Sequence, residues 1–147
     1  MSLIDGKKKM SKSDTNEGSR INMLDTPEII TKKIKRAKSD SSIGIEFNNP
    51  ERAESKNLLM IYSLLSGKEI SQCENEFSET GWGTFKKLIT EQLIESLKPI
   101  QEKYKVLIND PYQLNNILKE GKEKAEDLAN KTLKRVKSKL GFFEMEK

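Results

Sequence analysis

Three stretches of this chain place proline directly after a residue that can cap a helix. They are Thr26-Pro27-Glu28, Asn49-Pro50-Glu51 and Asn109-Asp110-Pro111. Such a pair favours a helix start, because the capping side chain accepts a free amide hydrogen and proline has none to leave unpaired. Apolar residues three and four apart follow each start, and no strand-like alternation is sustained after residue 5. The sequence therefore predicts an all-α fold, an irregular bundle of five or six helices from about residue 27 onward.

The first predicted helices differ in hydrophobicity. The helix that starts at Thr26 has an apolar face opposite a row of basic residues, formed by Ile29, Ile30, Ile34 and Ala37. The helix from Asn49 to Gly67 is the most hydrophobic, so we expect it to be central and to end at the glycine. A short third helix should begin with a capping box of Ser71 and Glu74.

The next predicted helix is long. Its apolar spacing continues to about Ile108, and we expect a bend near Pro99, because proline removes a helical hydrogen bond. Trp82 and Phe85 should anchor the core near its start. Stacking of Trp82 on an RNA base is an alternative role for this side chain.

The last predicted helix starts at Asp110 and ends at Gly141. Gly121 interrupts its apolar pattern, so we expect a break or a new helix there. Its first apolar residues, Leu114, Ile117 and Leu118, are expected to face inward.

Residues 1–25 contain the pentapeptide Lys9-Met10-Ser11-Lys12-Ser13. Two lysines three apart carry charge, while the serine hydroxyls and the backbone N–H groups can donate to anionic oxygens. The Lys12 ammonium stands on a long stem, which suits it to follow a phosphate chain as charge moves along it. The pattern favours binding of a nucleotide triphosphate, and a solvated lysine-rich terminus is the alternative. We expect this arm to be loose and Ser2-Leu3-Ile4 to be poorly ordered.

Further stretches accompany this pentapeptide. They are Arg20–Glu28, Lys32–Asp40, Asn57-Leu58-Leu59, Ile61-Tyr62-Ser63, Gly121–Ala125 and Leu140-Gly141-Phe142. Together they resemble, over nearly the whole chain, the class I aminoacyl-tRNA synthetases from their second signature motif onward. The tryptophanyl-tRNA synthetases are the family that this chain resembles most.

The resemblance implies ATP-dependent activation of tryptophan and its transfer to tRNA(Trp), with Mg²⁺ accompanying ATP and no bound cofactor. Lys9 and Lys12 would be the catalytic residues that stabilise the phosphates, and Lys12 would stabilise the charge of the transition state. Met10 and the backbone around Ser11 would help to hold the adenosine side, and Ser13 would orient the loop. These five residues would form the ATP-binding part of the chain.

The nucleotide-binding half of such an enzyme carries a His-x-Gly-His type motif, whereas this sequence contains no histidine. The resemblance therefore implies a C-terminal part, in which residues 1–25 are the arm of the catalytic domain and 26–147 the helical anticodon-region domain. The tryptophan pocket would lie in the other part. Apolar surface along 27–37 and 53–65 should then be exposed. The full-length family works as a homodimer.

The formal net charge is +4, and basic residues cluster at 7–12, 32–38 and 131–139. Such clusters attract polyanions such as RNA, although a solubilising surface would show the same composition. The candidate contacts with tRNA phosphates are Lys131, Lys134, Arg135 and Lys137.

The sequence predicts no metal site, because no Cys/His cluster is present. Cys73 is its single cysteine, which is typical of a reducing cytoplasm, and we expect this residue to pack in the fold. No stretch approaches the roughly 18 apolar residues of a membrane span, so no membrane partner is expected.

Three functions are compatible with these observations. The first is the C-terminal part of a tryptophan-specific synthetase. The second is an inactive fragment, or a helical module that binds tRNA or a partner protein. The third is a helical nucleic-acid-binding protein unrelated to synthetases, whose binding would be sensitive to salt and without preference for one tRNA.

Overall fold

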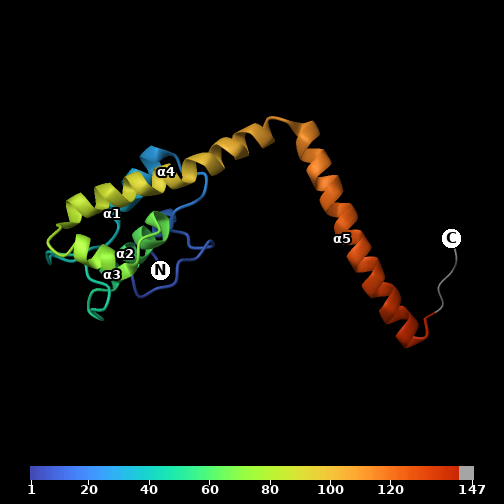
Figure 1. Ribbon diagram of the computed structural model, residues 1–147, viewed down its shortest axis with the longest axis horizontal. Coiled ribbons are helices and arrows are strands. Elements are labelled where there is room, and N and C mark those ends of the chain that lie inside the picture. The colour runs from blue at the N-terminus through green and yellow to red at the C-terminus, as the bar shows by residue number, and fades with distance from the viewer. Residues whose placement is uncertain (143–147) are drawn as a thin grey trace. The chain divides into compact units, whose positions relative to one another are not determined.

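The computed structural model describes residues 1–142, and this range contains helices and no strand (Figure 1). A short 3₁₀ turn, Glu17–Ser19, precedes five α-helices. They are α1 (Pro27–Arg36), α2 (Ala53–Ser66), α3 (Ile70–Glu76), α4 (Trp82–Ile108) and α5 (Pro111–Leu140). The prediction of an all-α fold is confirmed. The chain divides into two compact units, Met1–Glu102 and Lys103–Lys147, and α4 contributes to both.

The hydrophobic core of unit Met1–Glu102 draws on every helix in it. Its buried residues are Leu3, Ile30, Ile34, Ala37, Ile45, Leu58, Leu59, Tyr62, Cys73, Phe77, Phe85, Ile89, Leu93 and Leu97. Phe77 lies at the centre of an aromatic cluster, with ring centroids 5.0 Å from Tyr62 and 4.9 Å from Phe85 in edge-to-face geometry. Burial raises the pKa of the Cys73 thiol, which agrees with a packing role for this residue.

Two of the predicted helix starts and both predicted glycine ends are confirmed. Thr26 caps α1 through a 3.4 Å hydrogen bond from the Ile29 N–H, and Asp110 caps α5 by accepting from Gln113 at 2.9 Å. Gly67 and Gly141 follow α2 and α5 with φ of 69° and 72°, a left-handed conformation that glycine adopts without strain.

The predicted starts of α2 and α3 were wrong by a few residues. The stretch at Asn49 forms a turn, and α2 begins only at Ala53. Arg52 takes a non-helical backbone conformation while its guanidinium bonds Asp40 at 2.9 and 3.0 Å. The capping box of α3 uses Glu69 and Gln72, because the Glu74 carboxylate accepts the Phe47 N–H instead.

The prediction of a break at Gly121 was also wrong, since α5 runs through it. A glycine in a helix costs only about 1 kcal/mol relative to alanine, which a 30-residue helix tolerates. Pro99 lies inside α4, and the helix continues to Ile108 as expected. No residue of α5 is buried, so the expectation that Leu114, Ile117 and Leu118 face inward is not met.

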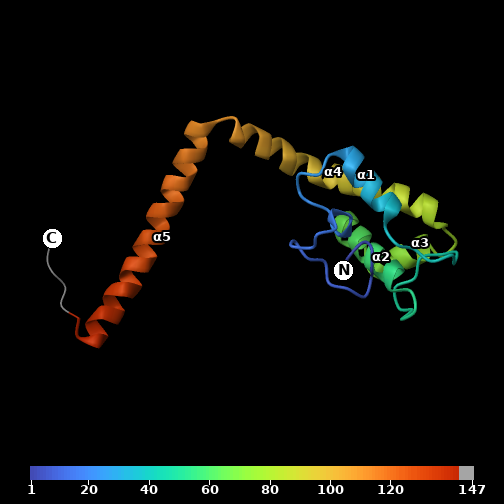
Figure 2. The ribbon, with the colours of Figure 1, turned by 180° about the vertical axis from the view of Figure 1, so that it is seen from behind.

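The N-terminal arm, which runs beside α2 in Figure 1 and Figure 2, is less loose than predicted. Leu3 is 2% exposed in the core, and its backbone bonds both the Ser19 carbonyl, at 2.9 Å, and the Lys38 N–H, at 2.8 Å. These two hydrogen bonds hold the start of the arm against the unit. Exposed apolar side chains do occur where expected, at Ile29, Met60 and Leu64.

Candidate functional site

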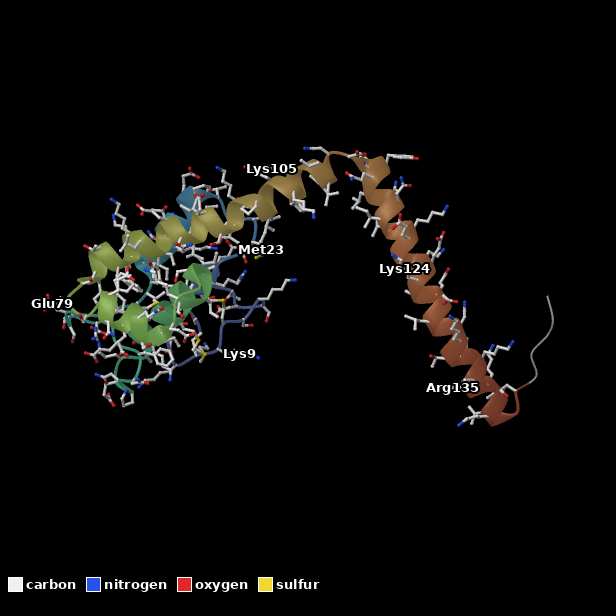
Figure 3. All side chains as sticks on the ribbon, in the orientation of Figure 1. Lys9, Met23, Glu79, Lys105, Lys124 and Arg135 are labelled. Carbon is white, nitrogen blue, oxygen red and sulfur yellow. The ribbon has the colours of Figure 1, made fainter. Side chains whose placement is uncertain are left out.

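The pentapeptide Lys9–Ser13, which we call the signature loop, begins at a closed turn. The Ser2 N–H donates to the Lys8 carbonyl at 2.8 Å, and the Lys8 N–H donates to the Asp5 carbonyl at 3.1 Å. Lys9 then lies at the outer edge of unit Met1–Glu102, where Figure 3 shows its side chain projecting from the loop. The turn therefore holds the first end of the loop.

Gly6 fits this turn against the first residues of α2. A Cβ at Gly6 would lie 2.6 Å from the backbone carbonyl of Ala53, so only glycine can approach this closely. The Gly6 N–H donates to the Glu54 carboxylate at 3.4 Å, and Lys38 pairs with the same carboxylate at 2.9 Å. The hydrogen bond from Lys38 holds the pKa of Glu54 below its usual value.

The other end of the loop is held by Arg20. Its Nη1 donates to the Asp14 carbonyl at 2.8 Å. The Asp14 carboxylate accepts the Asn16 N–H at 2.8 Å, and Asn16 in turn accepts the Gly18 N–H at 2.9 Å. These turns carry the chain from the loop to the 3₁₀ segment and on to Arg20.

Between these two ends, the structure brings the predicted ATP-contacting residues together on one exposed loop. Lys9, Ser11, Lys12 and Ser13 are exposed, and Met10 is half-buried against the core. The two serine hydroxyl oxygens lie 3.1 Å apart. The ammonium groups of Lys9 and Lys12 form no hydrogen bond or ion pair with another residue among 1–142, so both are available to bind an anionic ligand.

The predicted tRNA-contacting residues lie elsewhere, on α5 in the unit Lys103–Lys147. Lys131, Lys134, Arg135 and Lys137 are all exposed, and Figure 3 labels Arg135. Lys131 already pairs with Asp127, one helical turn earlier, at 2.6 Å. An exposed pair of this kind contributes little to stability, so Lys131 can exchange its partner for a phosphate at low cost.

A groove between α1 and α4 escaped the sequence analysis. It has a volume of about 590 Å³ and is lined by Thr31, Lys35, Trp82, Gly83, Lys86, Lys87, Thr90, Glu91 and Ile94. Trp82 is half-buried at this groove and donates its indole N–H to Asp40 at 3.2 Å. No sequence pattern indicated this groove, because it forms only where α1 packs beside α4.

Lys86 has a structural role in this groove. Its ammonium donates to the Ala37 carbonyl at 2.6 Å, and burial lowers its pKa. The ammonium therefore covers the C-terminal end of α1, where the helix dipole is negative.

Within residues 1–142, no group of three or more His, Cys, Asp or Glu side chains could hold a metal ion. No helix in the same range is long and apolar enough to cross a membrane.

Comparisons with known proteins agree on one family. Residues 1–98 match the family described as tRNA synthetases class I (W and Y). The chain is 80% identical to a tryptophan–tRNA ligase of Prochlorococcus marinus MED4 over all of its 147 residues, which are 44% of that relative. It is 46% identical to the chloroplastic/mitochondrial tryptophan–tRNA ligase of Arabidopsis thaliana, covering 98% of this chain and 35% of the relative.

A solved structure shares the fold. It is the crystal structure of tryptophanyl-tRNA synthetase from Mycoplasma pneumoniae, with a TM-score of 0.85 and 30% sequence identity. The match covers 98% of this chain and 45% of the Mycoplasma chain. The chain thus spans less than half the length of the relatives it matches.

Proposed function

Because the chain belongs to the class I tRNA synthetases of the tryptophan and tyrosine group, we propose that it acts as the C-terminal part of a tryptophan–tRNA ligase. Such an enzyme joins the tryptophan carboxylate to the α-phosphate of ATP and releases pyrophosphate. The aminoacyl group then passes to a hydroxyl of tRNA(Trp), and AMP leaves. The relatives favour tryptophan over tyrosine as the amino acid, because the similar proteins named above are all tryptophan enzymes.

The observation that carries this proposal is the exposed signature loop held at both of its ends. Negative charge grows on the β- and γ-phosphates as pyrophosphate departs, and an ammonium placed beforehand stabilises that charge. Lys9 and Lys12 are exposed and unpaired within the described residues, as this role requires. Mg²⁺ would accompany ATP and be held by its phosphates.

The remaining residues of the loop would complete the ATP contact. Met10 is half-buried against the core, and it would help to hold the adenosine side together with the backbone around Ser11. The hydroxyl of Ser13 lies beside that of Ser11 and would orient the loop. The helical part would contact tRNA backbone phosphates through Lys131, Lys134, Arg135 and Lys137, which position the tRNA without reading its bases.

A chimera tests this proposal. The 147 residues of this chain replace the matching part of the 80% identical relative, and tryptophan-dependent exchange of pyrophosphate into ATP is measured. We expect exchange close to that of the intact relative. We expect Lys12→Met to lower kcat by about 10²- to 10³-fold, as loss of a transition-state contact does. Lys7→Met is the matched control, because Lys7 is an equally exposed lysine in the turn before the loop.

Two results would contradict the proposal. A chimera that folds and shows no exchange would identify the chain as an inactive remnant. If that inactive chimera still bound tRNA(Trp) tightly, the chain would be a tRNA-binding helical module. Equal activities of the Lys12→Met and Lys7→Met variants would remove Lys12 from the catalytic residues.

A further inference from the structure

A continuous series of hydrogen bonds connects the end of the signature loop to α1. The Asp14 carbonyl accepts from Arg20 Nη1 at 2.8 Å, and Arg20 Nε donates to Asn22 Oδ1 at 3.1 Å. Asn22 then donates its backbone N–H and its side-chain amide to the two oxygens of Asp25, at 2.9 and 3.2 Å. Asp25 pairs with Lys33 of α1 at 2.5 Å.

The far end of this series is the fixed end. Asp25 and Lys33 are 7% and 8% exposed, so their ion pair belongs to the interior of the unit. Gln101 of α4 donates to the backbone carbonyls of Met23 and Asp25, at 2.9 and 3.0 Å. Two helices therefore hold the segment that carries Asn22 and Asp25, and Arg20 is the link from that segment to the loop.

Arginine suits this link for a geometric reason. Its guanidinium presents Nε and Nη1 in a rigid plane, so one side chain bonds two acceptors in a fixed relation. Here the two acceptors are the Asp14 carbonyl and Asn22 Oδ1. A lysine has a single ammonium on a flexible stem, so it would hold the two acceptors with less fixed geometry.

We propose that Arg20 is a positioning residue that holds the exit of the signature loop against α1 and so sets where Lys9 and Lys12 can reach. The loop entrance is already held by the bond between Ser2 and Lys8, so the five loop residues span two held ends. This inference rests on the proposed function for the reaction that it serves. A displacement of about 1 Å in a positioned group can lower a rate by 10²-fold.

The first experiment measures the backbone order of the signature loop in the 147-residue chain and needs no enzymatic assay. Backbone ¹⁵N relaxation gives order parameters for residues 9–13 and, as an internal reference, for α2. We expect Arg20→Met to lower the order parameters of residues 9–13 from those of the wild type, toward the value of about 0.6 or less that marks a flexible backbone. Those of α2 should stay unchanged. Arg20→Lys should give loop order parameters between those of the wild type and Arg20→Met. Arg36→Met, which removes an exposed arginine of α1, should leave the loop order parameters unchanged.

The second experiment places the same variants in the active chimera. We expect Arg20→Met to raise the KM for ATP or lower kcat about tenfold and to leave the KM for tryptophan unchanged. Arg20→Lys should lose less activity than Arg20→Met. Unchanged loop order in Arg20→Met, or equal loss of order in α2, would overturn the positioning role. A wild-type chimera without exchange activity would instead refute the proposed function, while the relaxation data would still decide the role of Arg20.

Discussion

Gly6 and Glu54 hold the turn before the signature loop against α2. Gly6 does so by lacking a side chain, and Glu54 through its carboxylate. The carbonyl of Ala53 occupies the place of a Cβ at Gly6, and the Glu54 carboxylate accepts the Gly6 N–H. Lys38 pairs with the same carboxylate oxygen at 2.9 Å.

Gly6→Ala should destabilise the chain by about 1–3 kcal/mol, the usual cost of forcing an extra carbon into a packed site. The reason is the 2.6 Å approach of a Cβ to backbone atoms, which cannot move aside as a side chain could. Urea unfolding followed by circular dichroism measures the change. Gly81→Ala is the control, because a Cβ there meets nothing within 4 Å. Equal stabilities of the two variants would show that the turn at Gly6 adapts.

Glu54 should make the stability of the chain depend on pH. Its pKa in the folded chain lies below the ordinary 4.5 because of the hydrogen bond from Lys38, so the unfolded chain binds the proton more readily. The contribution of Glu54 to the free energy of unfolding is therefore complete when the pH lies above the pKa of Glu54 in the unfolded chain. It is lost as the pH falls through the lower pKa of Glu54 in the folded chain. Urea unfolding at pH 7 and at pH 3 should show wild type and Glu54→Gln differing at neutral pH and converging in acid. A constant difference would refute the linkage.

At the scale of single elements, α5 has two glycines in contrasting conformations. Gly121 lies in the helix interior, where a Cβ meets nothing within 4 Å, whereas Gly141 follows the helix with φ of 72°. The first glycine lowers helix stability without serving a contact in the described residues. The second allows the Gly141 N–H to bond the Ser138 carbonyl at 3.3 Å and so ends the helix.

Substitution of each glycine by alanine should therefore have effects of opposite sign. Gly121→Ala should stabilise α5 by about 0.5–1 kcal/mol, because alanine loses less backbone entropy in a helix. Gly141→Ala should weaken the helix end, because a Cβ disfavours the left-handed conformation. Helix content measured against temperature by circular dichroism distinguishes them. A loss of helix in Gly121→Ala would mean that Gly121 serves a contact of α5 outside the described structure.

At the scale of the whole molecule, the hydrophobic core found among residues 1–142 lies in the first of the two units. Every residue of the core cluster precedes Glu102, whereas α5 buries none of its residues. Burial of apolar surface is the main favourable contribution to folding. The first unit therefore holds the residues that should make unfolding cooperative.

A chain of residues 1–102 should accordingly unfold in one cooperative transition, with a midpoint close to that of the whole chain. The truncation removes helix content but none of the core residues found among residues 1–142. Differential scanning calorimetry of both lengths checks this expectation. A non-cooperative transition in the shorter chain would show that residues 103–147 contribute to the core of the first unit.

The sequence by itself predicted the all-α class, the caps of α1 and α5, and the glycine ends of α2 and α5. These features depend on neighbours within about four residues, where capping and backbone preference act. The same reasoning misplaced the start of α2, because the bond of Arg52 to Asp40 joins residues 12 apart and overrides the local cap at Asn49.

Only the tertiary structure decided how the candidate site is held. The contact of Gly6 with Glu54 joins residues 48 apart, and the series from Arg20 reaches α1 and α4 through Asp25 and Gln101. Contacts between residues this distant depend on how the helices pack, which no local pattern encodes. The candidate phosphate-binding residues could therefore be named from the sequence, and their role stays a proposal, whereas the contacts that hold their loop became visible only in the folded chain.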